Sequence, residues 1–389
     1  MRPKYLLPMI GVAVVTGLFA ASALLSQSIE NRYNRLLRQP PYRASDAALR
    51  LHKTLTIVDL HADSLLWGRD LLHRSARGHV DLPRLQQANV ALQIFTVVTK
   101  VPKGLNLNGN SADTDDITRL AVAEGWPPAT WKSLKQRALY QAGRLNQMAD
   151  TSGGKLVIIR TRVDLDKLVE DRKTHPDRVG AILGIEGAHA LDGNVENLGP
   201  LFDAGFRLIS PTHFFDNEIA GSSTGVRKGG LTTKGRDLIR HMQAKHMVID
   251  LAHASSATIA DVTAMATGPV IVSHTGVRGT CNNPRNLSDE EIRAIAKTGG
   301  VIGIGYWKTA VCGTDAKAVA QAIRYTANIA GIEHVAIGSD FDGSTTMPFD
   351  ATGIPQITDA LLQQGFSEAE IRLIMGENSL RVLRQTLPE

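Results

Sequence analysis

Residues 56–63 have the sequence Thr-Ile-Val-Asp-Leu-His-Ala-Asp, a short β-rich apolar run that ends in an imidazole and a carboxylate. Short apolar runs alternate with longer amphipathic stretches along the rest of the chain, which is typical of parallel α/β architecture. Eight runs have this character: Thr56–Leu60, Val90–Val98, Val179–Ile185, Phe206–Ser210, Met247–Leu251, Val270–Ser273, Gly300–Gly305 and His334–Gly338. Eight such units predict a (β/α)8 TIM barrel. A ninth run, Lys155–Arg160, is either an extra strand or a replacement for one of the eight.

Most of these runs end in a side chain that can bind a metal or move a proton. The residues are His61, Asp63, Glu186, His213, His253, His274 and Asp340. In a parallel barrel the carboxyl ends of the strands meet on one face, where the active site is built. These seven residues lie at six run ends, because His61 and Asp63 follow the same run. One such run end is common, but six indicate a single site assembled from distant parts of the chain.

Each of these groups also has an ordinary structural interpretation. His61 and Asp63 point to the same side of an extended chain and can reach one metal ion, although such pairs are often incidental. Glu186 stands between glycines at the end of an apolar run, where a buried carboxylate needs a salt bridge or a metal. A single histidine is more often a core residue than a ligand, but His253 and His274 occupy the same point of two consecutive units. The combined pattern favours a metal centre.

The net charge of the chain lies entirely at its N-terminus. The total is +5, and residues 1–50 supply it with seven basic and two acidic residues, while the remainder balances at 36 of each sign. A domain without net charge offers no footprint for phosphates, so we expect no nucleic-acid partner.

An apolar run of 20 residues, Leu6–Leu25, follows the basic start of the chain. This length can cross a hydrocarbon core of roughly 30 Å as a helix. A signal peptide cleaved near Ala21-Ser22-Ala23 is the alternative, and the arginines at 32, 35 and 38 are unusual on the outer side of a membrane. We therefore predict a transmembrane anchor or signal peptide at 1–25, a polar stalk at 26–50 and the barrel at 51–389.

The segment 104–178 interrupts the alternation of runs. It begins with a Gly/Asn-rich stretch, and its periodicity predicts helices near 113–124 and 130–150. We interpret it as an insertion that lies over the barrel and helps to cover the site.

Taken in order, the motifs HxD, GxEG, Thr-His, DLAH, SH and SDFDG resemble those of the membrane dipeptidase family, which is renal dipeptidase-like (peptidase family M19) and part of the amidohydrolase barrel superfamily. The resemblance covers residues 54–383. It implies two zinc ions per subunit, bridged by Glu186 and a hydroxide. The first ion would be bound by His61, Asp63 and Glu186, and the second by Glu186, His253 and His274. A metal pair of this kind supplies a nucleophile near neutral pH.

The resemblance also implies roles for residues beyond the ligands. His213 would bind the substrate and stabilise the oxyanion, and Asp340 would pass a proton from the attacking water to the leaving amine. Arg285 would grip the free C-terminal carboxylate. Tyr306 is a further candidate to line the substrate pocket near that carboxylate.

The family resemblance extends to the two cysteines, Cys281 and Cys312, which would form a disulfide that braces the arginine loop. It also implies a homodimer. Family members from mammals carry a C-terminal lipid anchor, whereas this sequence has its apolar segment at the other end. We therefore expect attachment to the membrane through the N-terminal segment, with the catalytic domain in the cell envelope outside the cytoplasm, periplasmic if the source is bacterial.

The implied reaction is hydrolysis of dipeptides with free termini, including those with a C-terminal D-residue. A different amidohydrolase reaction, on a lactam, an ester or another amide, is the alternative. Relatives that use a carbamylated lysine should have a lysine at a mid-barrel strand end, and this chain has Glu186 instead. A non-catalytic barrel is disfavoured because every expected ligand is present.

Overall fold

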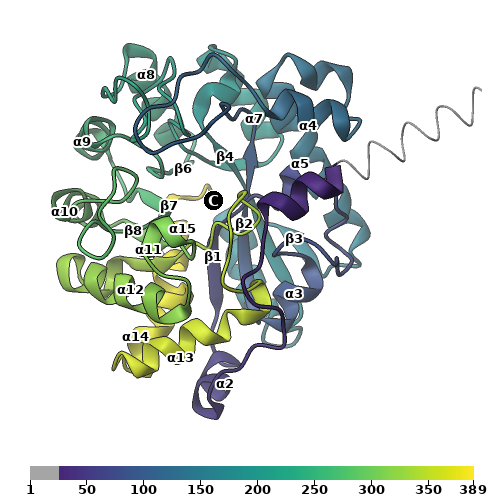
Figure 1. Cartoon of the computed structure of the whole chain (residues 1–389), viewed down its shortest axis with the longest axis vertical. Coiled ribbons are helices and arrows are strands. Elements are labelled where there is room, and N and C mark those ends of the chain that lie inside the picture. Colours follow the sequence, from purple (N-terminus) through teal and green to yellow (C-terminus); the bar gives the residue numbers. More distant parts are fainter. Residues whose placement is uncertain (1–25) are drawn as a thin grey trace, which may run out of the picture.

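The computed structural model describes residues 26–389 and contains one mainly parallel sheet surrounded by helices (Figure 1). The strands are β1 (Ile57–Ala62), β2 (Val90–Val98), β3 (Leu156–Ile158), β4 (Val179–Glu186), β5 (Phe206–Ile209), β6 (Val248–Ile249), β7 (Ile271–Thr275), β8 (Val301–Ile304) and β9 (Val335–Ile337). The order of the hydrogen-bonded strands is β6-β5-β4-β2-β1-β9-β8-β7. A parallel bridge between Asp250 and Ile271 joins the two ends of this order, so the strands close on themselves.

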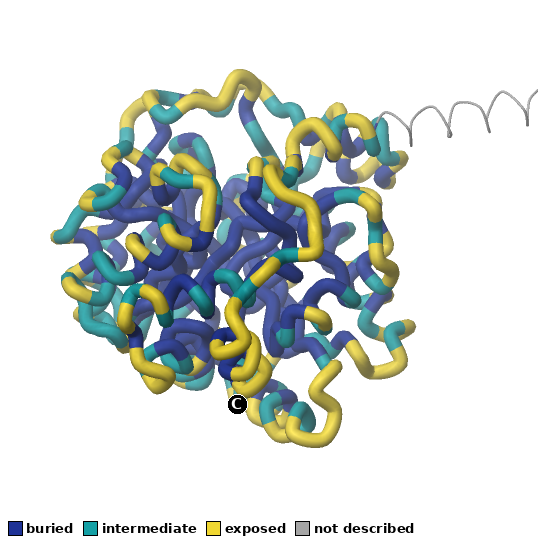
Figure 2. Tube along the Cα trace, turned by 60° about the horizontal axis from the view of Figure 1, so that its bottom comes forward, coloured by how far each residue is buried: buried dark blue, intermediate teal, exposed yellow. Residues whose placement is uncertain are grey.

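This closed arrangement confirms the predicted TIM barrel. The ninth apolar run forms β3, which pairs only with β4 and stands outside the barrel order. It is therefore an extra strand and replaces none of the eight. All residues of β1, β2 and β4 are buried, because helices cover the outside of the barrel and side chains fill the inside. Figure 2 shows these buried strands enclosed by more exposed helices and loops.

The helices follow the strands and form the outer layer. They are α2 (Asp46–His52), α3 (Leu82–Gln87), α4 (Ile117–Ala123), α5 (Leu134–Thr151), α6 (Arg162–Asp171), α7 (Leu198–Asp203), α8 (Thr233–Ala244), α9 (Ser256–Met265), α10 (Asp289–Lys297), α11 (Lys308–Val311), α12 (Ala316–Ala330), α13 (Pro355–Gln363), α14 (Glu368–Arg372) and α15 (Asn378–Thr386). Thr161, Ser288 and Ser367 begin three of them with capping boxes, which satisfy amide groups that the first turn leaves free. The two helices predicted in the insertion correspond to α4 and α5.

The N-terminal part of the described chain differs from the stalk that we expected. Residues 26–33 are helical, and Glu30 within them is only 2% exposed. A stalk would leave such a carboxylate in water, whereas here Arg69 and Arg77 pair with it and hold the segment against the barrel. The predicted anchor, Leu6–Leu25, lies outside the described residues. Within residues 26–389 no helix combines the length and apolar character needed to cross a membrane.

Candidate metal centre

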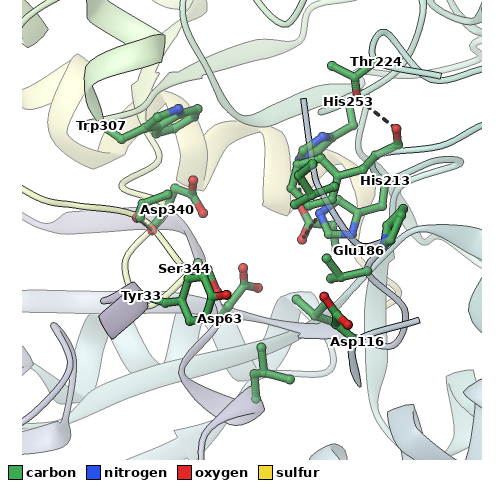
Figure 3. Close-up of a pocket in the computed structure, with 18 of the residues that line it drawn as sticks. Tyr33, Asp63, Asp116, Glu186, His213, Thr224, His253, Trp307, Asp340 and Ser344 are labelled. Carbon is green, nitrogen blue, oxygen red and sulfur yellow. Dashed lines mark hydrogen bonds and ion pairs between the residues drawn. The ribbon is translucent and has the colours of Figure 1, made fainter. Parts of the chain in front are cut away.

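The strand ends bring all seven predicted side chains to one end of the barrel. His61 lies in β1, Glu186 is the last residue of β4 and His274 lies in β7. The other four, Asp63, His213, His253 and Asp340, follow β1, β5, β6 and β9. All seven are at most 7% exposed. Figure 3 shows Glu186, His213 and His253 grouped on one side of the pocket, with Asp63 and Asp340 on the other.

Glu186 stands at the middle of this group. Its Oε1 atom lies 2.9 Å from His253 Nε2, 3.4 Å from His274 Nε2 and 3.7 Å from His61 Nε2. Its Oε2 atom lies 3.1 Å from His213 Nε2. One carboxylate thus joins the histidines of four different strand ends, which is the position that a bridging ligand needs.

Asp63 extends the cluster away from Glu186. Its Oδ1 atom lies 3.5 Å from His61 Nε2 and accepts a hydrogen bond of 2.6 Å from Thr96 Oγ1. Ligand atoms of His61, Asp63 and Asp340 also lie close enough together to hold a cation. The same is true of two further sets, His61 with Glu186 and His274, and Glu186 with His213 and His253.

A second layer of polar groups orients two of the histidines. Ser273 Oγ donates to Asp250 Oδ2 at 2.7 Å, so its oxygen can only accept from the imidazoles beside it. His61 Nδ1 and His274 Nδ1 each lie 3.0 Å from that oxygen. When neutral, both rings therefore carry their proton on Nδ1, which leaves the Nε2 lone pairs to bind a metal.

Asp59 supports the opposite side of the cluster in a similar way. It is fully buried and accepts hydrogen bonds from the amide and the hydroxyl of Ser339, at 2.7 and 2.6 Å. Asp340, which follows Ser339 in the sequence, has φ = 63°, and His253 has φ = 64°. A non-glycine residue in the left-handed region is strained by about 1 kcal/mol or more. The surrounding hydrogen bonds stabilise the left-handed backbone at these two residues, and this conformation directs both side chains into the site.

Burial sets the protonation of the cluster. It lowers the pKa values of His213, His253 and His274 well below the ordinary value of 6.5, so these imidazoles are neutral. Burial, with the charge of Asp63, raises the pKa of Glu186 well above its ordinary value. Burial alone would lower the pKa of His61, but the Asp63 and Glu186 carboxylates raise it to about 10.

These groups fit a bound cation. His253 Nε2 and His274 Nε2 lie 3.0 Å apart, and both face Glu186 Oε1. Neutral imidazole nitrogens that converge on a carboxylate in this way can bind a positive centre placed among them. The raised pKa of His61 points the same way, because the Asp63 and Glu186 carboxylates favour a positive charge beside them. Neutral imidazoles and carboxylates are the ligand set that divalent transition metals prefer.

A cavity of about 680 Å³ opens above this cluster. Arg285, only 8% exposed, reaches its wall and donates to His274 O at 2.9 Å. Among residues 26–389 no carboxylate lies within ion-pair distance of this guanidinium. Residues of the 104–178 insertion, including Leu105 and Leu120, also line the cavity, so the insertion covers the site as predicted.

Tyr306 does not line this cavity, in contrast to our expectation. It is fully buried, and its ring packs against Phe341 and Phe349. The next residue, Trp307, lines the cavity instead. The two neighbouring side chains point in opposite directions, so the sequence-based assignment was wrong by one position.

Cys281 and Cys312 form a disulfide, with their Cα atoms 5.2 Å apart. The bond joins the loop that carries Arg285 to the end of α11. Asn286 strengthens the same connection, because its side chain donates to Cys281 O and Ala310 O at 2.7 and 2.9 Å.

The second layer of the site, in particular Asp59, Asp250 and Ser273, was not predicted from the sequence. A signal for the two aspartates was present, since each is a charged residue inside an apolar run and is followed by leucine. A buried carboxylate of this kind needs hydrogen-bond donors. Asp250 finds one in Ser273 of β7, and Asp59 finds one in Ser339, which follows β9.

Comparison with known proteins agrees with this geometry. The family model for membrane dipeptidases, peptidase family M19, matches residues 45–387. Dipeptidase aclJ of Aspergillus oryzae is 28% identical over 358 residues, which cover 86% of this chain and 79% of that protein. An uncharacterized dipeptidase of Schizosaccharomyces pombe is 27% identical over 358 residues, covering 87% and 83% of the two chains.

Two solved structures share the fold. The metallopeptidase of Rhodobacter sphaeroides, crystallised with a phosphinate mimic of the dipeptide L-Ala-D-Ala, has a TM-score of 0.72 at 23% identity and covers 86% of this chain and 99% of its own. The probable dipeptidase PvdM of Pseudomonas aeruginosa has a TM-score of 0.73 at 18% identity, with coverages of 88% and 98%. The family match spans most of the chain, and the predicted ligands meet at the mouth of the barrel. This protein therefore belongs to the membrane dipeptidase family, peptidase family M19, and is a metal-dependent dipeptidase.

Proposed function

We propose that the metal centre holds two zinc ions, one bound by His61, Asp63 and Glu186 and the other by Glu186, His253 and His274. The observation that carries this proposal is the convergence of three imidazole Nε2 atoms on one oxygen of Glu186. When bound, the two ions would lower the pKa of a water molecule and so supply a nucleophile at neutral pH.

Asp340 is the proposed acid and base of the reaction. It lines the cavity, and burial raises its pKa well above the ordinary value for aspartate. A carboxylate with a raised pKa can take a proton from the attacking water and return it to the leaving amine at neutral pH. His213 also lines the cavity, with its Nε2 atom 3.1 Å from Glu186 Oε2, and would donate a hydrogen bond to the oxyanion as negative charge develops.

The proposed substrates are dipeptides with free termini. Arg285 is a buried guanidinium at the cavity wall without a carboxylate partner among the described residues, which suits it to bind the C-terminal carboxylate of the substrate. Acceptance of a C-terminal D-residue is supported by the Rhodobacter sphaeroides structure, which was crystallised with a mimic of L-Ala-D-Ala. We further propose that the N-terminal apolar segment attaches the enzyme to a membrane and that hydrolysis takes place in the cell envelope.

The bridging role of Glu186 can be tested by metal content. After dialysis against a buffer that contains zinc, elemental analysis of the wild-type protein should find two zinc ions per chain. Glu186→Gln should lose at least one ion and about a thousandfold in activity, because the amide keeps the shape but removes the charge that holds both ions. Glu196→Gln, on the exposed surface, is the matched control. Two tightly bound ions and normal turnover in Glu186→Gln would contradict the proposed bridge.

A further inference from the structure

Residues 26–44 form a wall of the active-site cavity that the family match, which begins at residue 45, does not include. Two side chains of this N-terminal segment, Ile29 and Tyr33, line the same cavity as Asp63, Glu186 and Arg285. Figure 3 draws Tyr33 among the side chains around the pocket, together with Asp63, Ser344 and Asp340. The segment thus lines the active-site cavity, although it lies outside the residues that match the family model.

A buried ion network fixes the helical part of this segment. Glu30 pairs with Arg69 at 2.5 Å and with Arg77 at 3.0 Å, and Arg69 continues to Asp342 at 2.5 Å. Glu30, Arg69 and Asp342 are 2%, 4% and 0% exposed. Removing one partner from a buried network of this kind leaves an uncompensated charge. The helix is therefore held firmly beside the loop that carries Asp340.

Backbone contacts fix the extended part of the segment in the same place. Asn34 Oδ1 accepts from the amide of Ser344 at 2.9 Å. Leu36 forms a parallel bridge with Met347, and the amides of Leu37 and Met347 donate across it at 2.9 and 2.8 Å. The extended half thus packs directly against the loop after β9, and the helical half is linked to the same loop through Arg69, so the wall has a defined position.

The wall is apolar where it meets the cavity. Ile29 packs against the cluster formed by Leu66, Ile117 and Leu120, and these three residues line the cavity as well. Leu66 follows β1, while Ile117 and Leu120 belong to α4, which follows β2. The aliphatic side chains have no hydrogen bond to offer a substrate, so they can act on it only through contact and size, whereas Tyr33 adds an aromatic ring with a hydroxyl group.

The strand order places the Ile29 end of this wall, which contacts side chains that follow β1 and β2, across the barrel mouth from Arg285. Arg285 follows β7 and donates to the backbone of His274 at the end of that strand. In the closed order of eight strands, β2 is four positions from β7 and therefore lies opposite it, and β1 is three positions from β7. A dipeptide whose carboxylate lies at Arg285 would therefore direct its N-terminal residue toward Ile29 and Tyr33.

We propose that Ile29 and Tyr33 determine which N-terminal side chains the enzyme accepts in a dipeptide. The proposal rests on the proposed function, because it takes the carboxylate to lie at Arg285. The wall limits the space for a bulky N-terminal side chain and supplies apolar contact to a small one. One methylene group more or less in a hydrophobic pocket alters discrimination between substrates by roughly 10- to 200-fold.

The test is a series of dipeptides X-Gly, in which X is glycine, alanine, leucine or phenylalanine and the C-terminal residue has no chirality. The measured quantity is the ratio of kcat/KM for Phe-Gly to that for Ala-Gly, in the full-length zinc-loaded protein. Ile29→Ala and Tyr33→Ala should each raise this ratio about tenfold, and Ile29→Trp should lower it. Leu37→Ala lies in the same segment, is 51% exposed and does not line the cavity, so it is the matched control and should leave the ratio unchanged.

Binding gives a second readout that does not depend on turnover. The affinities of non-hydrolysable phosphinate analogues with alanine-like or phenylalanine-like first residues should shift in the same direction, as measured by calorimetry. Ratios that stay within twofold of wild type in all three variants, with unchanged relative affinities, would overturn the proposal. If the wild-type protein hydrolyses no dipeptide at all, the proposed function itself fails, and this outcome is distinct from active variants with unchanged selectivity.

Discussion

At the scale of single residues, the site depends on how a few buried groups are oriented. Ser273 donates to Asp250 and can only accept from His61 and His274, so one hydroxyl fixes the tautomers of two histidines. Metal ligands that lack such partners typically bind 10- to 100-fold more weakly. The orientation of these candidate ligands is therefore set by residues that lie outside the groups able to hold a metal.

Arg285 provides the sharpest test at this scale. We predict that Arg285→Ala raises KM for a free dipeptide about 10- to 100-fold, because a charge-assisted bidentate contact to the carboxylate is lost. The same change should affect KM little for a dipeptide whose C-terminus is amidated. Steady-state kinetics on both substrates would measure this, with exposed Arg293→Ala as the control. An equal loss on the two substrates would remove the carboxylate-binding role.

At the scale of elements, α2 is tied to the barrel by a buried histidine. His52 Nε2 donates to Ala88 O at 2.9 Å, and Nδ1 accepts from Thr358 Oγ1 at 2.8 Å. Burial lowers the pKa of His52 from the ordinary 6.5 to about 4. The folded protein therefore holds this ring neutral over an interval in which the unfolded chain would protonate it.

The sign of the pH effect follows from this difference. Between pH 6.5 and about 4 the unfolded state binds one more proton at His52 than the folded state, so stability falls as the pH falls through that interval. Over the whole interval, the free energy of unfolding falls by about 3 kcal/mol. Urea unfolding would measure the free energy of unfolding at pH 7.5 and at pH 5. The difference between the two values should be smaller for His52→Gln than for wild type. His175→Gln, at an exposed position, should show the same difference as wild type. Equal pH dependence in all three proteins would refute this role of His52.

The elements also show how far a sequence can predict this structure. The apolar runs predicted every barrel strand to within two residues at each end, because strands buried on both faces have a strong local signal. Tyr306 and Trp307 mark the limit: both are aromatic and follow β8, and only the packing against Phe341 and Phe349 decides which one enters the core. The contact of Glu30 with Arg69 joins residues 39 positions apart, and no local pattern specifies it.

At the scale of the whole molecule, the barrel serves to bring distant residues to one point. His61 and Asp340 are separated by most of the domain, yet the Asp340 amide donates to His61 O at 3.2 Å because β1 and β9 are neighbours in the closed sheet. The N-terminal segment adds a wall to the same mouth. We therefore propose that this assembly is a two-metal dipeptidase.

Hydrolysis of a free dipeptide with a C-terminal D-residue, such as Gly-D-Ala, tests this claim most directly. The full-length protein should be stripped of metal, reloaded with zinc to a measured stoichiometry, and assayed by the release of free amino acids. We predict that turnover appears as the second ion binds and is lost when a chelator is added. A folded protein that holds two zinc ions and cleaves neither this nor any other free dipeptide would contradict the account.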